Sequence, residues 1–285
     1  MKRATMAMLS FAAALAAMVA IQGCGVLGGP PTGVAVSSGP EESDSTIVVS
    51  WTVPAEGAPD KYVVYFRPVT DSAFQVVGET TATSYTHNPA GMTGNYKVTA
   101  VFGGDDYDGA DRPTTVPIHN DTITVWEINA DSSRCGYGWS RDSGIGGIFS
   151  MVDSASCASV DFYISDLLAG FGSATQKIVS PNKADTIDPG AMGIVPAADW
   201  RINGFSNPLL DEQSPLPAYA PPPNANYFIY TEIPSSGLYY VGCYTAGETE
   251  KHYALIKVNY ADVAGGQMNL ETYYQLVPGL RLIRH

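Results

Sequence analysis

The sequence predicts an all-β protein of two domains, and three observations support this fold class. Aromatic residues make up 11% of the 285-residue chain, and 29 glycines and 20 prolines interrupt it. Aromatic and β-branched residues favour strands, whereas Gly and Pro mark turns. Apolar and polar residues alternate in many short runs, as in strands with one buried face. The alternation pauses at residues 119–121 and restarts at Thr122, which places a domain junction there.

The N-terminal segment has the organisation of a secretory signal. Lys2 and Arg3 precede an apolar run, Ala4–Ile21. A basic start followed by a short apolar stretch is typical of signal peptides. The next residues, Ile21-Gln22-Gly23-Cys24, resemble a bacterial lipobox, in which the cysteine is acylated and becomes the first residue of the mature chain.

The lipobox resemblance implies how the mature protein is located. Met1–Gly23 would be removed, Cys24 would carry the lipid, and residues 24–32 would form a tether. Gly25, rather than Asp, follows the cysteine, which by the same resemblance favours an outer membrane. Two alternatives stay open: an ordinary cleaved signal, and a retained helix, since about 20 apolar residues span a bilayer.

The charge of the chain is strongly acidic. The formal net charge is −13, and loss of Lys2 and Arg3 leaves 13 basic against 28 acidic residues, or −15. Such a surface repels phosphate backbones, so we expect no nucleic-acid partner. The acidity is also explained by solubility alone, because net charge keeps a protein soluble in an exposed compartment.

The first domain is expected at Gly33–Ile118. Turn signals every 8–12 residues separate its alternating runs, a rhythm that favours an antiparallel sandwich. Seven strands are expected: Val34–Ser37, Thr46–Val53, Lys61–Arg67, Ala73–Gly78, Thr83–Tyr85, Asn95–Phe102 and Arg112–Ile118.

These runs resemble a fibronectin type III domain. The resemblance is carried by an opening Pro31, by VVSWTVP around Trp51, by KYVVYFR around Tyr62 and by NYKVTAV around Tyr96. It implies that Trp51 is the core tryptophan and Tyr96 the tyrosine-corner residue, with Tyr62 in the same core. These are packing roles. The chain has no Arg-Gly-Asp, so an integrin-binding loop is not implied.

One acidic stretch of this domain is a candidate cation site. Residues 104–112 read GDDYDGADR and hold Asp105, Asp106, Asp108 and Asp111. Calcium is bound by several carboxylate or carbonyl oxygens, but the spacing is not that of an EF-hand. A polar hairpin tip rich in Asp and Gly is the alternative.

The cysteines allow one disulfide. Acylation of Cys24 would leave Cys135, Cys157 and Cys243, in a compartment where disulfides persist. Cys135 and Cys157 flank a predicted hairpin, so we predict that these two pair. The sequence contains no CxxC and no Cys/His ligand spacing, which argues against zinc.

The second domain is expected at 119–285. Its strand-like runs surround a Pro-rich segment, Ser173–Asn226, that we expect to be a long irregular insertion. Long loops of this kind often bind ligands, so we expect it to contribute to any binding surface. The expected strands are TITVWEIN from Thr122, Cys135–Ser140, Gly147–Val152, Val160–Ser165, Tyr227–Ile233, Gly237–Thr245, His252–Tyr260 and Gln267–Gln275, with short helices at Asp166–Phe171 and Ala197–Arg201 and a tail at Leu276–His285.

The second domain is also similar to HmuY-like surface lipoproteins. The similarity rests on GYGWSRDSG, VDFYI and the closing GLYYVGCYT, HYALIKVNY and NLETYYQ. It implies an all-β domain, and some members bind haem. Haem needs axial His or Met ligands, whereas surface His and core Met are the alternative. The available side chains are His119, Met151, Met192, His252, Met268 and His285.

No enzymatic motif stands out. HExxH, P-loop and nucleophile-elbow patterns do not occur, and the SxxK match at Ser180–Lys183 lacks its partner motifs. We therefore expect a non-enzymatic, lipid-anchored binding, adhesion or structural module. Its partner would be a protein, a glycan or a small ligand. The alternatives are a haem-binding lipoprotein and an accessory protein of extracellular polymer hydrolysis, because carboxylate pairs need not be close in sequence.

Overall fold

The computed structural model describes residues 28–39, 46–166, 175–188, 194–195, 199–210, 217–223 and 226–284. The predicted leader and Cys24 lie outside these residues. The protein is all-β, and the α-helix α2 (Ala184–Ile187) has four residues. Within the described ranges, no helix has the length and apolarity that crossing a membrane requires.

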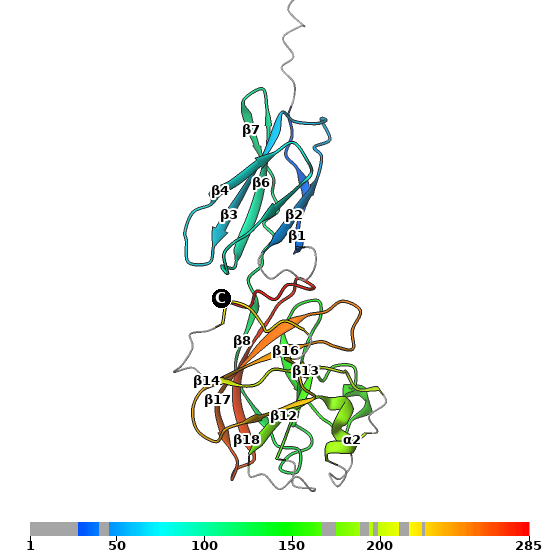
Figure 1. Ribbon diagram of the computed structural model, residues 1–285. Coiled ribbons are helices and arrows are strands. Elements are labelled where there is room, and N and C mark those ends of the chain that lie inside the picture. The colour runs from blue at the N-terminus through cyan, green and yellow to red at the C-terminus, as the bar shows by residue number, and fades with distance from the viewer. Residues whose placement is uncertain are drawn as a thin grey trace, which may run out of the picture.

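The first domain is a sandwich of two antiparallel sheets (Figure 1). The three-stranded sheet has the order β1 (Thr32–Ser38), β2 (Ile47–Thr52), β5 (Ser84–His87). The four-stranded sheet has the order β4 (Gln75–Thr80), β3 (Lys61–Pro68), β6 (Gly94–Phe102), β7 (Asp105–Asp108).

The core of the sandwich follows from the alternation in the sequence. Trp51, Tyr62 and Tyr96 are all buried in one apolar cluster. The ring of Trp51 meets that of Tyr62 edge-on, with centroids 5.1 Å apart. The Tyr96 hydroxyl lies 2.8 Å from Nδ1 of His87, nine residues upstream. The three residues therefore fill the space between the sheets.

The last strand of the sandwich differs from the prediction. It is β7, at Asp105–Asp108, and not Arg112–Ile118. Gly103 and Gly104 have φ of 59° and 95°, a conformation that glycine adopts without strain, and they form the tight turn into β7. Two prolines in residues 112–118 lack the N–H that a strand ladder needs.

The second domain contains two further sheets. One has the order β10 (Gly146–Phe149), β9 (Gly136–Trp139), β11 (Phe162–Ser165), β12 (Gln176–Val179), β15 (Tyr230–Ile233). The other has the order β13 (Gly204–Phe205), β16 (Tyr239–Tyr244), β17 (Tyr253–Asp262), β18 (Gln267–Tyr274), β8 (Ile118–Trp126), and β14 (Leu209–Leu210) also pairs with β16. Because β8 starts at Ile118, residues 119–121 lie inside a strand.

These two sheets enclose the largest apolar core. Their facing side chains form one buried cluster that includes Phe162, Ile178, Ile256 and Leu270. A second cluster covers the outer face of the β9–β15 sheet, where Tyr163 and Val179 pack against Ile187 and Trp200. A third covers the outer face of the β16–β18 sheet, where Tyr253, Leu255 and Tyr273 pack with Ala220 and Ile283. The described parts of Ser173–Asn226 thus supply β12, α2, β13 and β14 as well as irregular cover.

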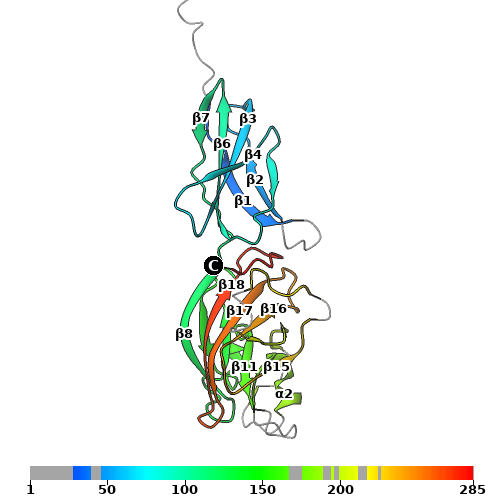
Figure 2. The same cartoon turned by 60° about the vertical axis from the view of Figure 1, so that its left-hand side comes forward.

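The C-terminal segment, Val277–Ile283, joins the two domains. Val277, Leu280 and Leu282 belong to the core cluster of the first sandwich, although they follow β18 of the second domain. Main-chain hydrogen bonds tie the segment to the second domain, from Ala220 N to Arg281 O (2.7 Å) and from Gly279 N to Lys251 O (2.7 Å). The segment that we expected to be a tail therefore packs against both domains, and Figures 1 and 2 show it at the junction between them.

The described chain enters the sandwich at the end far from the second domain. Gly28 lies against Phe102 and Tyr107, beside the turn between β6 and β7. Both views place β7 and this turn at the end of the first domain that points away from the second domain (Figures 1 and 2). The two domains are thus stacked along one axis, with the first domain between the N-terminal side and the second domain.

Candidate functional site: a groove beside β15

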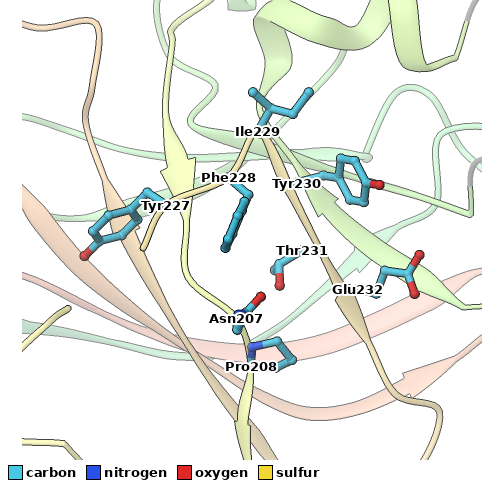
Figure 3. Close-up of a pocket in the computed structure, with 8 residues that line it drawn as sticks. All are labelled: Asn207, Pro208, Tyr227, Phe228, Ile229, Tyr230, Thr231 and Glu232. Carbon is cyan, nitrogen blue, oxygen red and sulfur yellow. The ribbon is translucent and has the colours of Figure 1, made fainter. Parts of the chain in front are cut away.

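A groove opens in the second domain where an edge of each sheet diverges from the other. Its volume is about 620 Å³, within the range of ligand sites. One wall is Asn207 and Pro208, between β13 and β14, and the other is the stretch Tyr227–Glu232 that contains most of β15. Figure 3 shows Phe228 and Thr231 directed into the space between these walls.

The two walls meet at one point and then separate. Phe205 and Phe228 exchange main-chain hydrogen bonds of 2.8 and 2.9 Å. Gly204 makes this approach possible, because a Cβ there would lie 2.8 Å from Cβ of Tyr227. The pairing between the walls does not continue: Pro208 has no N–H, and β14, like β13, pairs with β16. The groove is the wedge left between β14 and β15.

Among the described residues, β15 lies at the edge of its sheet, with one pairing partner, β12. On its inner side it pairs with β12, and Ser180 N donates to Ile229 O at 2.8 Å, so these opposite residues form a hydrogen-bonded pair. In an antiparallel ladder such pairs alternate, which makes Ile178 and Thr231 the next hydrogen-bonded pair. The main-chain groups of Tyr230 and Glu232 therefore point away from β12, toward the groove.

The groove is lined mainly by apolar surface. Phe228 is 46% exposed and Ile229 is 45% exposed, so both present apolar surface to the groove. Leu209, at the start of β14, is 40% exposed. Glu232 is the one charged side chain of the described lining. The arrangement offers apolar contact, main-chain hydrogen-bonding groups and one carboxylate.

A buried ion-pair network fixes the chain that leads into β13. The Asp161 carboxylate is fully buried and accepts from Arg141 Nη2 (2.6 Å), Arg201 Nη1 (2.8 Å), Asn203 Nδ2 (2.9 Å) and Trp139 N (2.8 Å). Buried charges are tolerated when they are paired and hydrogen-bonded in this way. Arg201 and Asn203 precede β13 directly, so the network holds one wall of the groove.

A buried lysine lies behind the other wall. The Lys177 side chain is fully buried on β12, and its Nζ donates to Thr175 O at 2.8 Å. Burial lowers the pKa of Lys177, against the opposing charges of Glu232, Asp166 and Asp188. The Glu232 carboxylate is 3.9 Å from Nζ, and its side chain is 52% exposed. The Glu232 side chain is therefore accessible to a ligand.

Two other carboxylates have raised pKa values but lie outside this lining. Burial, and then the charge of Asp166, raises the pKa of Glu127. Its carboxylate accepts from the main-chain nitrogens of Asn129 (2.7 Å) and Ala130 (3.0 Å). Burial also raises the pKa of Asp188, which accepts from the hydroxyls of Tyr163 and Ser165 at 2.7 Å each. Both carboxylates therefore accept hydrogen bonds from neighbouring residues within the fold.

The candidate calcium residues are not gathered into a site. Asp108 pairs with Lys97 (3.2 Å) and Arg112 (3.0 Å), and Asp111 accepts from Val34 N at 3.1 Å. Asp105 and Asp106 are exposed on β7 rather than in a loop. Within the described ranges, no three His, Cys, Asp or Glu side chains are placed to hold a metal ion.

The predicted disulfide is not present in the structure. Cys135, Cys157 and Cys243 are buried free thiols. Cys135 and Cys157 share the cluster outside the β9–β15 sheet, and Cys135 Sγ donates to Ser132 O at 3.3 Å. Burial raises the pKa of Cys135 to about 12, so this thiol is unreactive at neutral pH.

The candidate haem ligands are dispersed. Met151 packs in the outer cluster and Met268 in the core between the sheets. His252 is buried with Nδ1 3.0 Å from Gln275 O, whereas His119 stacks on Tyr273 with ring centroids 4.6 Å apart. None of these four lines the groove. Met192 and His285 lie outside the described residues.

The sequence led us to expect that Ser173–Asn226 contributes to a binding surface, and this segment holds Asn207 and Pro208, but it did not single out the other wall. Tyr227–Ile233 is a strand-like run, and its alternation does not reveal that one edge lacks a partner. One indirect signal was available. Pro208 lies next to strand-like residues, and proline in such a place indicates an edge or a break in a sheet.

Comparison with known proteins shows distant likeness only. No protein-family model and no curated protein matches the chain. A DUF4466 family protein from Parabacteroides merdae is 11% identical over 81% of this chain and 92% of its own, with a TM-score of 0.37. The FN3 domain of human collagen XX is 27% identical over 30% of this chain and 88% of its own, with a TM-score of 0.25.

A further match is an Fn3-like protein from Clostridium thermocellum, which is 20% identical over 30% of this chain and 88% of its own, with a TM-score of 0.25. The fold of the first domain is defined by its own strand order, three strands against four around Trp51. The similarity of the second domain to HmuY-like lipoproteins stays a prediction.

Proposed function

We propose that this chain is a lipid-anchored surface protein whose second domain binds a partner in the groove beside β15. The observation that carries the proposal is the stacking of the domains. The described chain enters at Gly28, at the end of the first sandwich far from the second domain. A lipid on Cys24 would therefore hold the groove domain away from the membrane.

The first domain is suited to act as a spacer. Its longest strand, β6, has nine residues, and at about 3.4 Å per residue this gives a length of roughly 30 Å. The C-terminal segment fills the base of the sandwich and hydrogen-bonds to the second domain. These contacts hold the two domains together, so the first domain would set the distance between the anchor and the groove. Acyl chains contribute about 0.8 kcal/mol per buried CH₂, and several together hold a protein stably at a membrane.

The groove supports binding rather than polymer hydrolysis. It combines exposed Phe228 and Ile229 with main-chain groups of β15, the mixture typical of recognition sites. Glycoside hydrolysis uses two carboxylates that flank the scissile bond, and the described lining offers Glu232 alone.

Acylation and display are tested in a diderm bacterial host. Radiolabelled palmitate is fed to cells that express the wild type, Cys24→Ala or Cys157→Ala. The proposal expects label in the wild type and in Cys157→Ala, and none in Cys24→Ala. Protease added to intact cells should cleave the labelled protein. Label in Cys24→Ala, or a labelled chain that is fully protected in intact cells, would contradict the proposal.

A further inference from the structure

We propose that the groove binds an extended, basic segment of a partner protein, which adds to the free edge of β15 as an extra strand. This inference rests on the proposed function in taking the groove as the binding site, and it names the kind of partner. Strand addition to an exposed sheet edge draws its affinity from main-chain hydrogen bonds and its selectivity from alternate side chains.

The first argument is the geometry of the edge. Tyr230 and Glu232 direct their N–H and C=O groups toward the groove, because Ile229 and Thr231 are the residues that bond to β12. Two residues of a strand span about 6.6 Å, which is the repeat at which another extended chain presents its own N–H and C=O groups. A glycan has no such repeat.

The second argument is that β15 itself carries none of the residues that usually protect an edge strand. Proteins usually guard an edge strand with Lys, Pro, a bulge or a covering element. β15 reads Tyr-Thr-Glu-Ile, with neither Lys nor Pro, and no bulge interrupts its register with β12. The neighbouring edge, β14, stands across the groove, and the pairing between the walls ends at Phe205 and Phe228.

The third argument concerns side chains. Phe228 and Thr231 point into the space between the walls, and Pro208 faces them (Figure 3). An added strand would direct every second residue toward this apolar surface. The segment that fits therefore alternates apolar residues with polar ones.

The fourth argument is charge. Glu232 is the charged residue of the described lining, its side chain is half-exposed, and the ammonium group nearest to it, that of Lys177, is buried. The chain as a whole carries −13, which attracts cations over longer distances. A Lys or Arg on the polar face of the segment complements both.

The test uses the purified full chain and a synthetic probe. The probe is a blocked ten-residue peptide in which valine alternates with threonine and lysine, labelled with a fluorophore for anisotropy titration. Its control is the same peptide N-methylated at the central residues, which removes the main-chain donors and keeps the side chains. A second control replaces each lysine by glutamate.

Substitutions of Glu232 separate main-chain from side-chain recognition. Glu232→Pro removes the outward N–H without breaking the ladder to β12, since proline is tolerated at such an edge position. Glu232→Gln keeps that N–H and removes only the charge. Exposed charge pairs are worth up to about 1 kcal/mol, so we expect Glu232→Gln to weaken binding by about 2- to 5-fold and Glu232→Pro by more than 10-fold.

The outcomes are distinct. Support requires wild-type binding to the lysine peptide, loss of binding with the N-methylated peptide, and slower hydrogen exchange of the Tyr230 and Glu232 amides in the complex. Equal binding of the N-methylated peptide, unchanged binding by a folded Glu232→Pro, or no binding of the probe would overturn the inference. If the groove instead binds an envelope glycan, and Phe228→Ala weakens that binding, the inference fails and the proposed function stands.

Discussion

Replacement of Leu280 by alanine tests whether the C-terminal segment is part of the first domain. Leu280 is fully buried in the cluster that contains Trp51, Tyr62 and Tyr96, yet it follows the last strand of the second domain. A buried Leu→Ala change typically costs 2–5 kcal/mol, because it removes apolar contact and leaves a cavity. We expect the free energy of unfolding to fall by about 3 kcal/mol. The strands of the first domain should be destabilised, although they lie about 200 residues earlier in the chain.

The assay is amide hydrogen exchange combined with thermal unfolding. Since about 1.4 kcal/mol is a factor of ten, the slowest amides of β3 and β6 should exchange roughly 100-fold faster in Leu280→Ala. If the two domains unfold together, a protein of this size loses about 2–4 °C of Tm per kcal/mol. We therefore expect Tm to fall by roughly 6–12 °C. The control is Val76→Ala, whose side chain is 58% exposed on β4 and should change stability by less than about 0.5 kcal/mol. Unchanged exchange in β3 and β6, with faster exchange confined to the second domain, would refute the reasoning.

Two further experiments test the second domain. Asp161→Asn leaves the guanidinium groups of Arg141 and Arg201 without their buried carboxylate and should cost about 3–5 kcal/mol in urea unfolding. Glu248→Gln, which removes a partly exposed partner of Arg141, should cost about 1 kcal/mol or less, and equal losses would contradict the network. Glu271 is partly buried, but hydrogen bonds and a lysine charge lower its pKa from 4.5 to about 2. Its contribution of about 2–3 kcal/mol should be complete above pH 4.5 and disappear as pH falls to 2. Glu271→Gln should remove that pH dependence, and a curve parallel to the wild type would refute it.

Local sequence patterns predicted most of the strands. β2, β3 and β6 follow runs in which apolar residues alternate around Trp51, Tyr62 and Tyr96, and the same residues form the core. Such positions depend on the period of the side chains along one strand, and that period is visible in the chain.

Other features depend on contacts between distant residues. Residues 112–118 contain the β-branched residues that favour strands. They also contain two prolines, and the tight turn at Gly103 and Gly104 places the last sandwich strand at Asp105–Asp108. The C-terminal segment is too short to show a period, and its burial follows from packing under a domain that precedes it by more than 150 residues.

The groove could not be predicted for a similar reason. The run around Phe228 indicates a strand, but its place at the edge of a sheet is a property of the topology. β13 and β14 both pair with β16, and among the described residues β13 meets the chain before β15 only in the bridge between Phe205 and Phe228. Sequence alternation shows which residues face a core, and it does not show which strands lack a neighbour.

The most direct test of the account is peptide binding to intact cells. Cells that display the wild type are incubated with the fluorescent lysine peptide, beside cells that express Cys24→Ala or Glu232→Pro at matched levels. We expect fluorescence on wild-type cells alone, because in our proposal Cys24 carries the anchor and Glu232 contributes the main-chain edge. Equal labelling of the Cys24→Ala or Glu232→Pro cells, or unlabelled wild-type cells, would contradict an anchored protein that presents an open strand edge.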